Sequence, residues 1–144
     1  MITESYLTRF LIESNKIEGI TEFDIESEMT AARIFLNKKR ITEHDLENFV
    51  SIIQEDAQLR GEPSIPGVQV GGRVAPNSGP EVLIALDKIL RDANYLVDPW
   101  RIHCEYEHLH PFTDGNGRSG RMLWLWMVQD SLTGNSILFL QAFY

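Results

Sequence analysis

One short stretch of the chain, residues 110–121, gathers side chains that can carry chemistry. It reads His-Pro-Phe-Thr-Asp-Gly-Asn-Gly-Arg-Ser-Gly-Arg. His110 can exchange a proton near neutral pH, and the carboxylate of Asp114 can hold a hard cation such as Mg²⁺. Arg118 and Arg121 are three residues apart, so on a helix they share a face and can bind the same anion. The stretch therefore offers a base, a metal ligand and an anion site.

The backbone of this stretch is that of a loop leading into a helix. Pro111 disfavours a helical conformation at His110, so a preceding helix should end there. Gly115 and Gly117 allow positive φ angles and a close approach of the backbone to a ligand, and the apolar residues 122–128 continue as a helix. A glycine-bearing loop before a helix points backbone N–H groups and the positive end of the helix dipole at one place. We therefore expect an anion site there.

The stretch resembles the motif of the Fic family, HPFx(D/E)GNGRxxR, at every specified position. Fic proteins are mostly adenylyltransferases, which transfer AMP from ATP to a protein hydroxyl. The resemblance implies that His110 deprotonates a Ser, Thr or Tyr hydroxyl of a target protein, which can be the chain itself. It implies that Asp114 holds Mg²⁺ between the α- and β-phosphates of ATP. It also implies that Gly115, Asn116 and Gly117 form an anion hole. Arg118 would then bind the β-phosphate and Arg121 the γ-phosphate.

Other interpretations remain open beside this one. The Doc branch of the family, which transfers phosphate, has Lys where this chain has Gly117, so the glycine favours AMP transfer. Removal of AMP, transfer of another nucleotide or phosphate group, and a nucleotide-sensing interaction module are the alternatives. Taken singly, a His beside a Pro or an Asp-Gly-Asn-Gly turn is usually structural, but the order and spacing together favour function. Phe112 is expected to anchor the loop in the core.

The first helix carries a second resemblance. Residues 1–19 have apolar positions at helical spacing, with Ser14 and Glu18 four residues apart on one face. The segment Ser-Asn-Lys-Ile-Glu-Gly that begins at Ser14 resembles the inhibitory motif of the family, (S/T)xxxE(G/N). In relatives this glutamate pairs with the second arginine of the catalytic motif, here Arg121, and prevents the γ-phosphate from docking. The resemblance implies that the chain is autoinhibited by Glu18.

A proline- and glycine-rich segment interrupts the helical pattern before the catalytic motif. Gly71 and Gly72 lie between short apolar runs, which is typical of a β-hairpin, although an ordinary surface loop is the alternative. In the Fic family a hairpin flap precedes the motif at about this distance and pairs with the target by main-chain hydrogen bonds. The resemblance implies a flap over residues 64–76, and the pairing residues are assigned to Gly67, Val68, Gln69 and Val70.

Length and composition limit the classes of protein to consider. The chain has 144 residues, enough for one domain with a core, and 43% of them are hydrophobic. Its net charge of −8 argues against a general nucleic-acid-binding surface, while ATP needs only local positive charge. No apolar run reaches the roughly 18 residues of a membrane span. The single cysteine, Cys104, is expected in the core, and a cytoplasmic location is predicted. The oligomeric state is not indicated.

The remaining apolar spacing predicts further helices. They are expected over 21–39 with Thr21 as the N-cap, over 42–57, over 80–94, from Asp98 to the catalytic motif, and over 136–144. His103 should satisfy a buried hydrogen bond near the catalytic loop, and no zinc cluster is expected from the histidines. We therefore predict a single all-α domain over 1–144, the Fic fold, with six to eight helices and a short hairpin flap.

Overall fold

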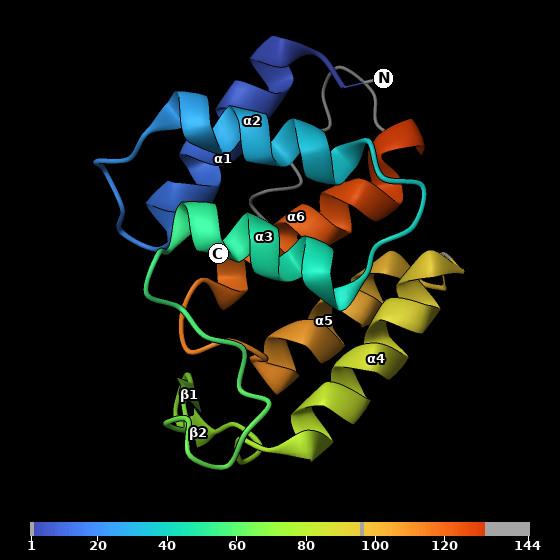
Figure 1. The fold of residues 1–144 in the computed structure, drawn as a ribbon. Helices are drawn as coiled ribbons and strands as arrows, with labels where there is room; N and C mark the ends of the chain where they lie inside the picture. Colours follow the sequence, from blue (N-terminus) through green and yellow to red (C-terminus); the bar gives the residue numbers. More distant parts are fainter. Residues whose placement is uncertain (1, 96, 132–144) are drawn as a thin grey trace.

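The computed structural model describes residues 2–95 and 97–131. These residues form six α-helices, one 3₁₀ turn and one antiparallel hairpin (Figure 1). The elements are α1 Glu4–Ile17, α2 Ile25–Leu36, α3 Glu43–Ile53, β1 Gln69–Val70, β2 Arg73–Val74, α4 Pro80–Asn94, α5 Pro99–Leu109, α6 Asn116–Val128 and η1 Gln129–Ser131. The predicted all-α fold with a small hairpin is confirmed, and the helix predicted over 136–144 lies outside the described residues.

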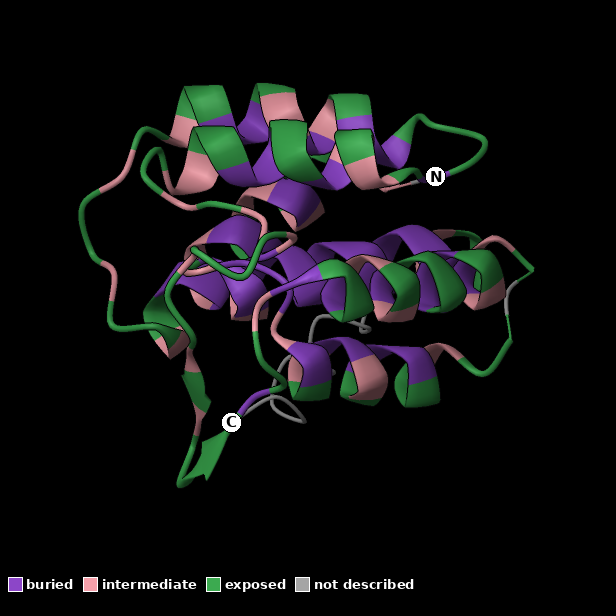
Figure 2. Cartoon of the chain, turned by 60° about the horizontal axis from the view of Figure 1, so that its bottom comes forward, coloured by how far each residue is buried: buried purple, intermediate pink, exposed green. Residues whose placement is uncertain are grey.

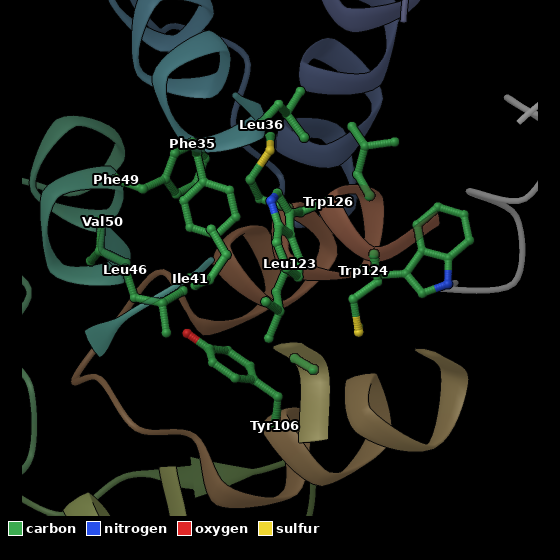
Figure 3. Close-up of a cluster of buried hydrophobic side chains, with 14 of the residues drawn as sticks. Phe35, Leu36, Ile41, Leu46, Phe49, Val50, Tyr106, Leu123, Trp124 and Trp126 are labelled. Atoms are coloured by element: carbon green, nitrogen blue, oxygen red, sulfur yellow. The ribbon is translucent and has the colours of Figure 1, made fainter. Parts of the chain in front are cut away.

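Helix α6 is the element around which the others pack. Apart from Gly117 and Val128, its residues are buried, and α1, α2, α3 and α5 all contact it, while α4 packs on α5. A helix that is apolar nearly all round needs neighbours on every side. Figure 3 shows Leu123, Trp124 and Trp126 of α6 among the side chains of the core. The core therefore fixes α6, and with it the loop of residues 110–115 that leads into its first turn.

Side-chain caps explain where most of the helices begin. The Thr3 hydroxyl accepts the N–H of Tyr6 at the start of α1, and Thr42 forms a reciprocal capping box at the start of α3. The prediction for α2 was wrong at its start: the helix is capped by Asp24 rather than by Thr21, because the Asp24 carboxylate accepts both the N–H and the hydroxyl of Ser27.

Helix α5 packs against α6 and α4 and turns its remaining residues to solvent. Ile102, His103, Tyr106 and Leu109 are buried, as the helical spacing predicts. Cys104 lies between these positions on the opposite face and is exposed, so its prediction as a core residue was wrong. Trp100, which we also expect to face the core, is instead 47% exposed. In the described part of the chain, no helix is both long enough and apolar enough to cross a bilayer.

The predicted hairpin is present and projects away from the helices (Figures 1 and 2). Gln69 lies opposite Val74 and Val70 lies opposite Arg73, and Gly71 takes a φ of 60° in the turn between the strands. One further main-chain bond, from the Ala75 N–H to the Val68 carbonyl at 3.0 Å, extends the ladder. The Gly-Gly signal thus located the turn correctly.

Candidate active site

His110 stands at the point where α5 ends and the loop begins. It has a left-handed conformation, with φ of 48°, as expected for a residue that cannot continue a helix before Pro111. Its Nδ1 lies 2.5 Å from the main-chain oxygen of Glu107. A carbonyl oxygen only accepts, so Nδ1 carries the hydrogen and Nε2 of the neutral ring has a free lone pair. The structure therefore leaves Nε2 able to accept a proton.

The electrostatic surroundings keep His110 neutral. Burial is the largest influence and lowers the pKa of His110 below its ordinary value. The hydrogen bond to Glu107 and the negative charge of Glu18 oppose this shift, while the positive charges of Arg60 and Arg73 lower the pKa further. A neutral imidazole at physiological pH is the form that a general base requires.

The loop between His110 and α6 is closed by the side chain of Asn116. Its Oδ1 accepts the N–H of Phe112 and its Nδ2 donates to the carbonyl of Phe112, both at 2.8 Å. Phe112 itself is 1% exposed, in agreement with its prediction as an anchor. Since the side-chain amide of Asn116 is used inside the loop, the group of Asn116 that remains for the predicted anion hole is its backbone N–H.

The N-terminus of α6 has the geometry that the predicted anion site requires. Gly115 is the N-cap, with φ of 77°, and it provides no side-chain acceptor. The first N–H groups of a helix have no acceptor within the helix, so those of Asn116 and Gly117 can point to a ligand. The predicted anion-hole residues therefore converge at one helix end.

Asp114 lies exposed beside this helix end, and one of its oxygens accepts the N–H of Gly115 at 2.7 Å. Magnesium is commonly held by one or two carboxylates together with phosphate oxygens and water. The described residues contain no cluster of three or more His, Cys, Asp or Glu side chains for a metal, so an all-protein cage is not offered there. A single exposed carboxylate beside an anion site suits a cation that a bound phosphate completes.

The two arginines of the motif turn to different helices. Arg118 is buried and donates to the Ile53 carbonyl and to Oε1 of Gln54, both at 2.9 Å, at the end of α3. Its Nε is buried without a hydrogen-bond partner in the described structure. The spacing of three residues predicts that Arg118 and Arg121 reach one anion, but here each guanidinium is already held by protein oxygens.

Arg121 is held by the end of α1, the segment that resembles the inhibitory motif. Its Nε donates to Oγ of Ser14 at 2.8 Å, and its Nη2 donates to the Ser14 carbonyl at 3.0 Å and to Oε1 of Glu18 at 2.7 Å. The Arg121 side chain is 4% exposed and that of Glu18 is 37% exposed. The structure thus brings Ser14, Glu18 and Arg121 together across more than one hundred residues of sequence.

The carboxylate of Glu18 also covers the start of α6. A methyl group on the Cα of Gly117 would overlap Oε1 of Glu18 and would lie 3.0 Å from Nη1 of Arg121. The carboxylate of Glu18 therefore lies at the N-terminus of α6 and beside Arg121. This is the place where the sequence predicts a phosphate group.

Arg60 is a structural residue of the site that the sequence did not reveal. It is fully buried, and its guanidinium donates to the carbonyls of His110, Leu109 and Pro76 at 2.7–2.8 Å. Its N–H also donates to the Pro111 carbonyl. An arginine in a segment rich in Pro and Gly looks solvated in the sequence, and nothing in its neighbours signals these partners. Arg60 ties the end of α5 to the segment that follows the hairpin.

A hydrogen bond links the flap to the last turn of α5, just before His110. Nη2 of Arg73 donates to the His108 carbonyl at 3.1 Å, two residues before His110. The residues assigned to target pairing, Gly67 to Val70, are exposed or half-buried. His103, as expected, makes a buried hydrogen bond near the loop, between its Nδ1 and the Gly120 carbonyl at 3.2 Å.

The comparison with protein families agrees with this geometry. The model of the Fic/DOC family matches residues 31–128. The chain belongs to the Fic/DOC family. A curated relative is the "Protein adenylyltransferase Fic" of Culex quinquefasciatus, which is 25% identical over 135 residues, a match that covers 81% of this chain. The match covers only 27% of that relative, so the chain spans about a quarter of its length. No solved structure matches the chain at a comparable level.

Proposed function

We propose that this Fic chain transfers AMP from ATP to a protein hydroxyl, and that Glu18 restrains the reaction. The observation that carries the proposal is the placement of His110, whose Nε2 is free to accept a proton, directly before a helix end suited to phosphate. Family membership and the name of the relative from Culex quinquefasciatus support the same reaction.

In this reaction the hydroxyl oxygen of the target attacks the α-phosphorus of ATP. His110 Nε2 takes the hydroxyl proton, the bond from the α-phosphorus to the bridging oxygen breaks, and pyrophosphate leaves with that electron pair. Catalysis is then mainly orientation and stabilisation of negative charge. The α6 N–H groups and Arg118 bind the inner phosphates, and Arg121 binds the γ-phosphate.

Asp114 is the residue that would hold Mg²⁺. When bound, the cation would neutralise part of the phosphate charge. The protein's own contribution there is to fix the carboxylate, which the Gly115 N–H orients, beside the helix end.

Inhibition follows from competition for one guanidinium. The Glu18 carboxylate binds Arg121 at 2.7 Å, and a carboxylate and a phosphate use the same donors in the same way. While Glu18 is bound, the γ-phosphate lacks this partner. Relief requires Glu18 to rotate away or the end of α1 to shift.

The flap supplies an edge for the target segment. Because the Ala75 N–H donates to the Val68 carbonyl, Val68 and Ala75 form a hydrogen-bonded pair. The next pair, Gln69 with Val74, is then of the non-hydrogen-bonded kind. The N–H and C=O of Gln69 therefore point away from β2 and can pair with an added strand. We assign target docking to this edge.

The test is incubation with labelled ATP and Mg²⁺ followed by intact-mass measurement. The parent, Glu18→Gly, and Glu18→Gly with His110→Ala are compared, with Glu22→Gly as a matched control because Glu22 is an exposed glutamate just beyond the motif. We expect a gain of about 329 Da, one AMP group, in Glu18→Gly alone.

Other outcomes separate the alternatives. A gain of about 80 Da would indicate phosphate transfer instead. With no gain in any variant, the same set is assayed on candidate target proteins. ATP binding without transfer to any protein, together with a biological effect that survives His110→Ala, would favour the nucleotide-sensing module and contradict the proposal. Arg121→Ala should abolish transfer even when Glu18 is already removed.

A further inference from the structure

Arg121 depends entirely on α1 in this structure. Within the described residues, its hydrogen bonds go to the Ser14 hydroxyl, the Ser14 carbonyl and the Glu18 carboxylate, all in the last turn or cap of that helix. If Glu18 withdraws with the end of α1, a buried guanidinium loses these partners at once. An unpaired buried charge is costly, so a second anchor is needed for Arg121 to stay in place for ATP.

Glu107 is the acidic side chain placed to provide that anchor. It lies on α5, and its Oε1 packs so closely on Gly120, the residue before Arg121, that a methyl group on the Gly120 Cα would overlap it. This oxygen is buried and has no hydrogen-bond partner in the described structure. Buried polar atoms almost always have a partner, which makes this unused acceptor, packed on the residue before Arg121, a feature to explain.

The charges around Glu107 connect it to the inhibitory pair. Burial raises its pKa to about 7; the positive charge of Arg121 on α6 opposes this rise, and the negative charge of Glu18 beyond α1 adds to it. On its own helix the titratable neighbours are His103, Cys104, Tyr106 and His110. One cation thus lies within electrostatic range of two carboxylates, of which only Glu18 is paired with it here.

We propose that Glu107 is a positioning residue for ATP, whose carboxylate takes the Arg121 guanidinium when Glu18 withdraws and holds it for the γ-phosphate. The proposal rests on the proposed function, since it assigns the working partner of the arginine that Glu18 blocks. Glu107 belongs to α5, which is fixed against α6, so this partner does not depend on the position of α1. The two carboxylates then bind the same arginine in turn: Glu18 in the inhibited state and Glu107 in the active state.

Nucleotide binding by calorimetry tests the proposal. In a Glu18→Gly background, Glu107→Gln is compared with Glu105→Gln, the same change on the same helix at a glutamate whose ion pair is with Arg101. We expect Glu107→Gln to weaken Mg-ATP binding about tenfold, the scale of one lost charge-assisted hydrogen bond. AMP, which lacks the γ-phosphate, should bind unchanged, and Glu105→Gln should change neither. Unchanged ATP affinity, or equal losses for ATP and AMP, would overturn the proposal.

A second measurement leaves Glu107 intact and so avoids any folding defect. The carboxyl carbon of Glu107 is titrated by NMR in the parent and in Glu18→Gly, without nucleotide. Removing Glu18 takes away a repelling charge and frees Arg121, so the pKa of Glu107 should fall from about 7. An unchanged or higher pKa contradicts the pairing.

These readouts separate the two proposals. AMP transfer by Glu18→Gly with no effect of Glu107→Gln on ATP binding keeps the proposed function and rejects the role of Glu107. If the titration and the ATP binding change as expected but the chain transfers no AMP, the role of Glu107 is kept and the proposed function is rejected.

Discussion

The carboxylate of Glu18 lies directly on Gly117, at the first turn of α6, and bonds to Arg121 one turn further on. The missing side chain at Gly117 therefore makes room for the contact between Glu18 and Arg121 at the helix end proposed to bind phosphate. Because α6 is helical at this residue and its φ is not positive, an alanine there is conformationally acceptable, and what opposes it is the overlap with Glu18 and the close approach to Nη1 of Arg121.

We predict that Gly117→Ala removes most of the contribution that Glu18 makes to the free energy of unfolding. In the parent, Glu18→Gly should lower the free energy of unfolding by about 1 kcal/mol or more, because it leaves Arg121 with a partner fewer. In the Gly117→Ala background, where the pair is already displaced, the same change should cost little. Denaturant titrations of the four chains give the coupling energy. Gly72→Ala, at a glycine with open space around it, is the control. If the effects of Glu18→Gly and Gly117→Ala on the free energy of unfolding are fully additive, the contact between Glu18 and Gly117 is contradicted.

The pH dependence of transfer should report a His110 with a lowered pKa. The neutral ring is the active form, so the maximal rate in Glu18→Gly should be constant above the pKa and fall as pH falls through it. Burial lowers that pKa from the ordinary 6.5, which places the midpoint below 6.5. Removing the charge of Arg73, which also lowers the pKa, should move the midpoint upward in Arg73→Gln. Arg101→Gln, an exposed change on the first turn of α5, should leave it in place. A midpoint above 7 would show that another group limits the rate.

Arg60 should be a major contributor to stability. Arg60→Ala leaves the buried carbonyls of Leu109 and His110 without their donor, and we expect a loss of about 3 kcal/mol and a melting temperature lower by roughly 10 °C. Arg60→Lys should recover only part of this, because one ammonium cannot span carbonyls on both sides as the planar guanidinium does. Thermal unfolding is the measurement, with Arg91→Ala on the exposed face of α4 as the control. A change of less than about 2 °C for Arg60→Ala would mean that water or other donors replace it.

The helices and the turn of the flap could be predicted because their signals are local. Thr3 and Thr42 cap helices within three residues, and the bounds of α4 follow from Pro80 and the apolar spacing. Local signals also misled: Thr21 resembles a cap, but Asp24 offers a stronger acceptor. The contacts of Arg60 could not be predicted, since its acceptors His110 and Leu109 lie about fifty residues away, Pro76 lies 16 residues away, and the sequence gives no sign of them. The pairing of Glu18 with Arg121 could be predicted from a family resemblance but not from any local rule. The unpaired oxygen of Glu107 becomes visible only in the packing of α5 against α6.

The free edge of β1 gives the last prediction. Gln69 directs its N–H away from β2, so Gln69→Pro removes a donor that the hairpin itself does not use, and proline is tolerated at such edge positions. If a target strand pairs there, Gln69→Pro in a Glu18→Gly background should lower kcat/KM for a target protein about tenfold, the scale of one or two lost main-chain hydrogen bonds. The affinity for ATP should stay the same. Gln69→Ala keeps the N–H and removes only the side chain, so it should transfer AMP at nearly the parental rate. Equal losses in the two variants would instead show that the side chain of Gln69 is recognised, and no loss in either would show that the target docks elsewhere.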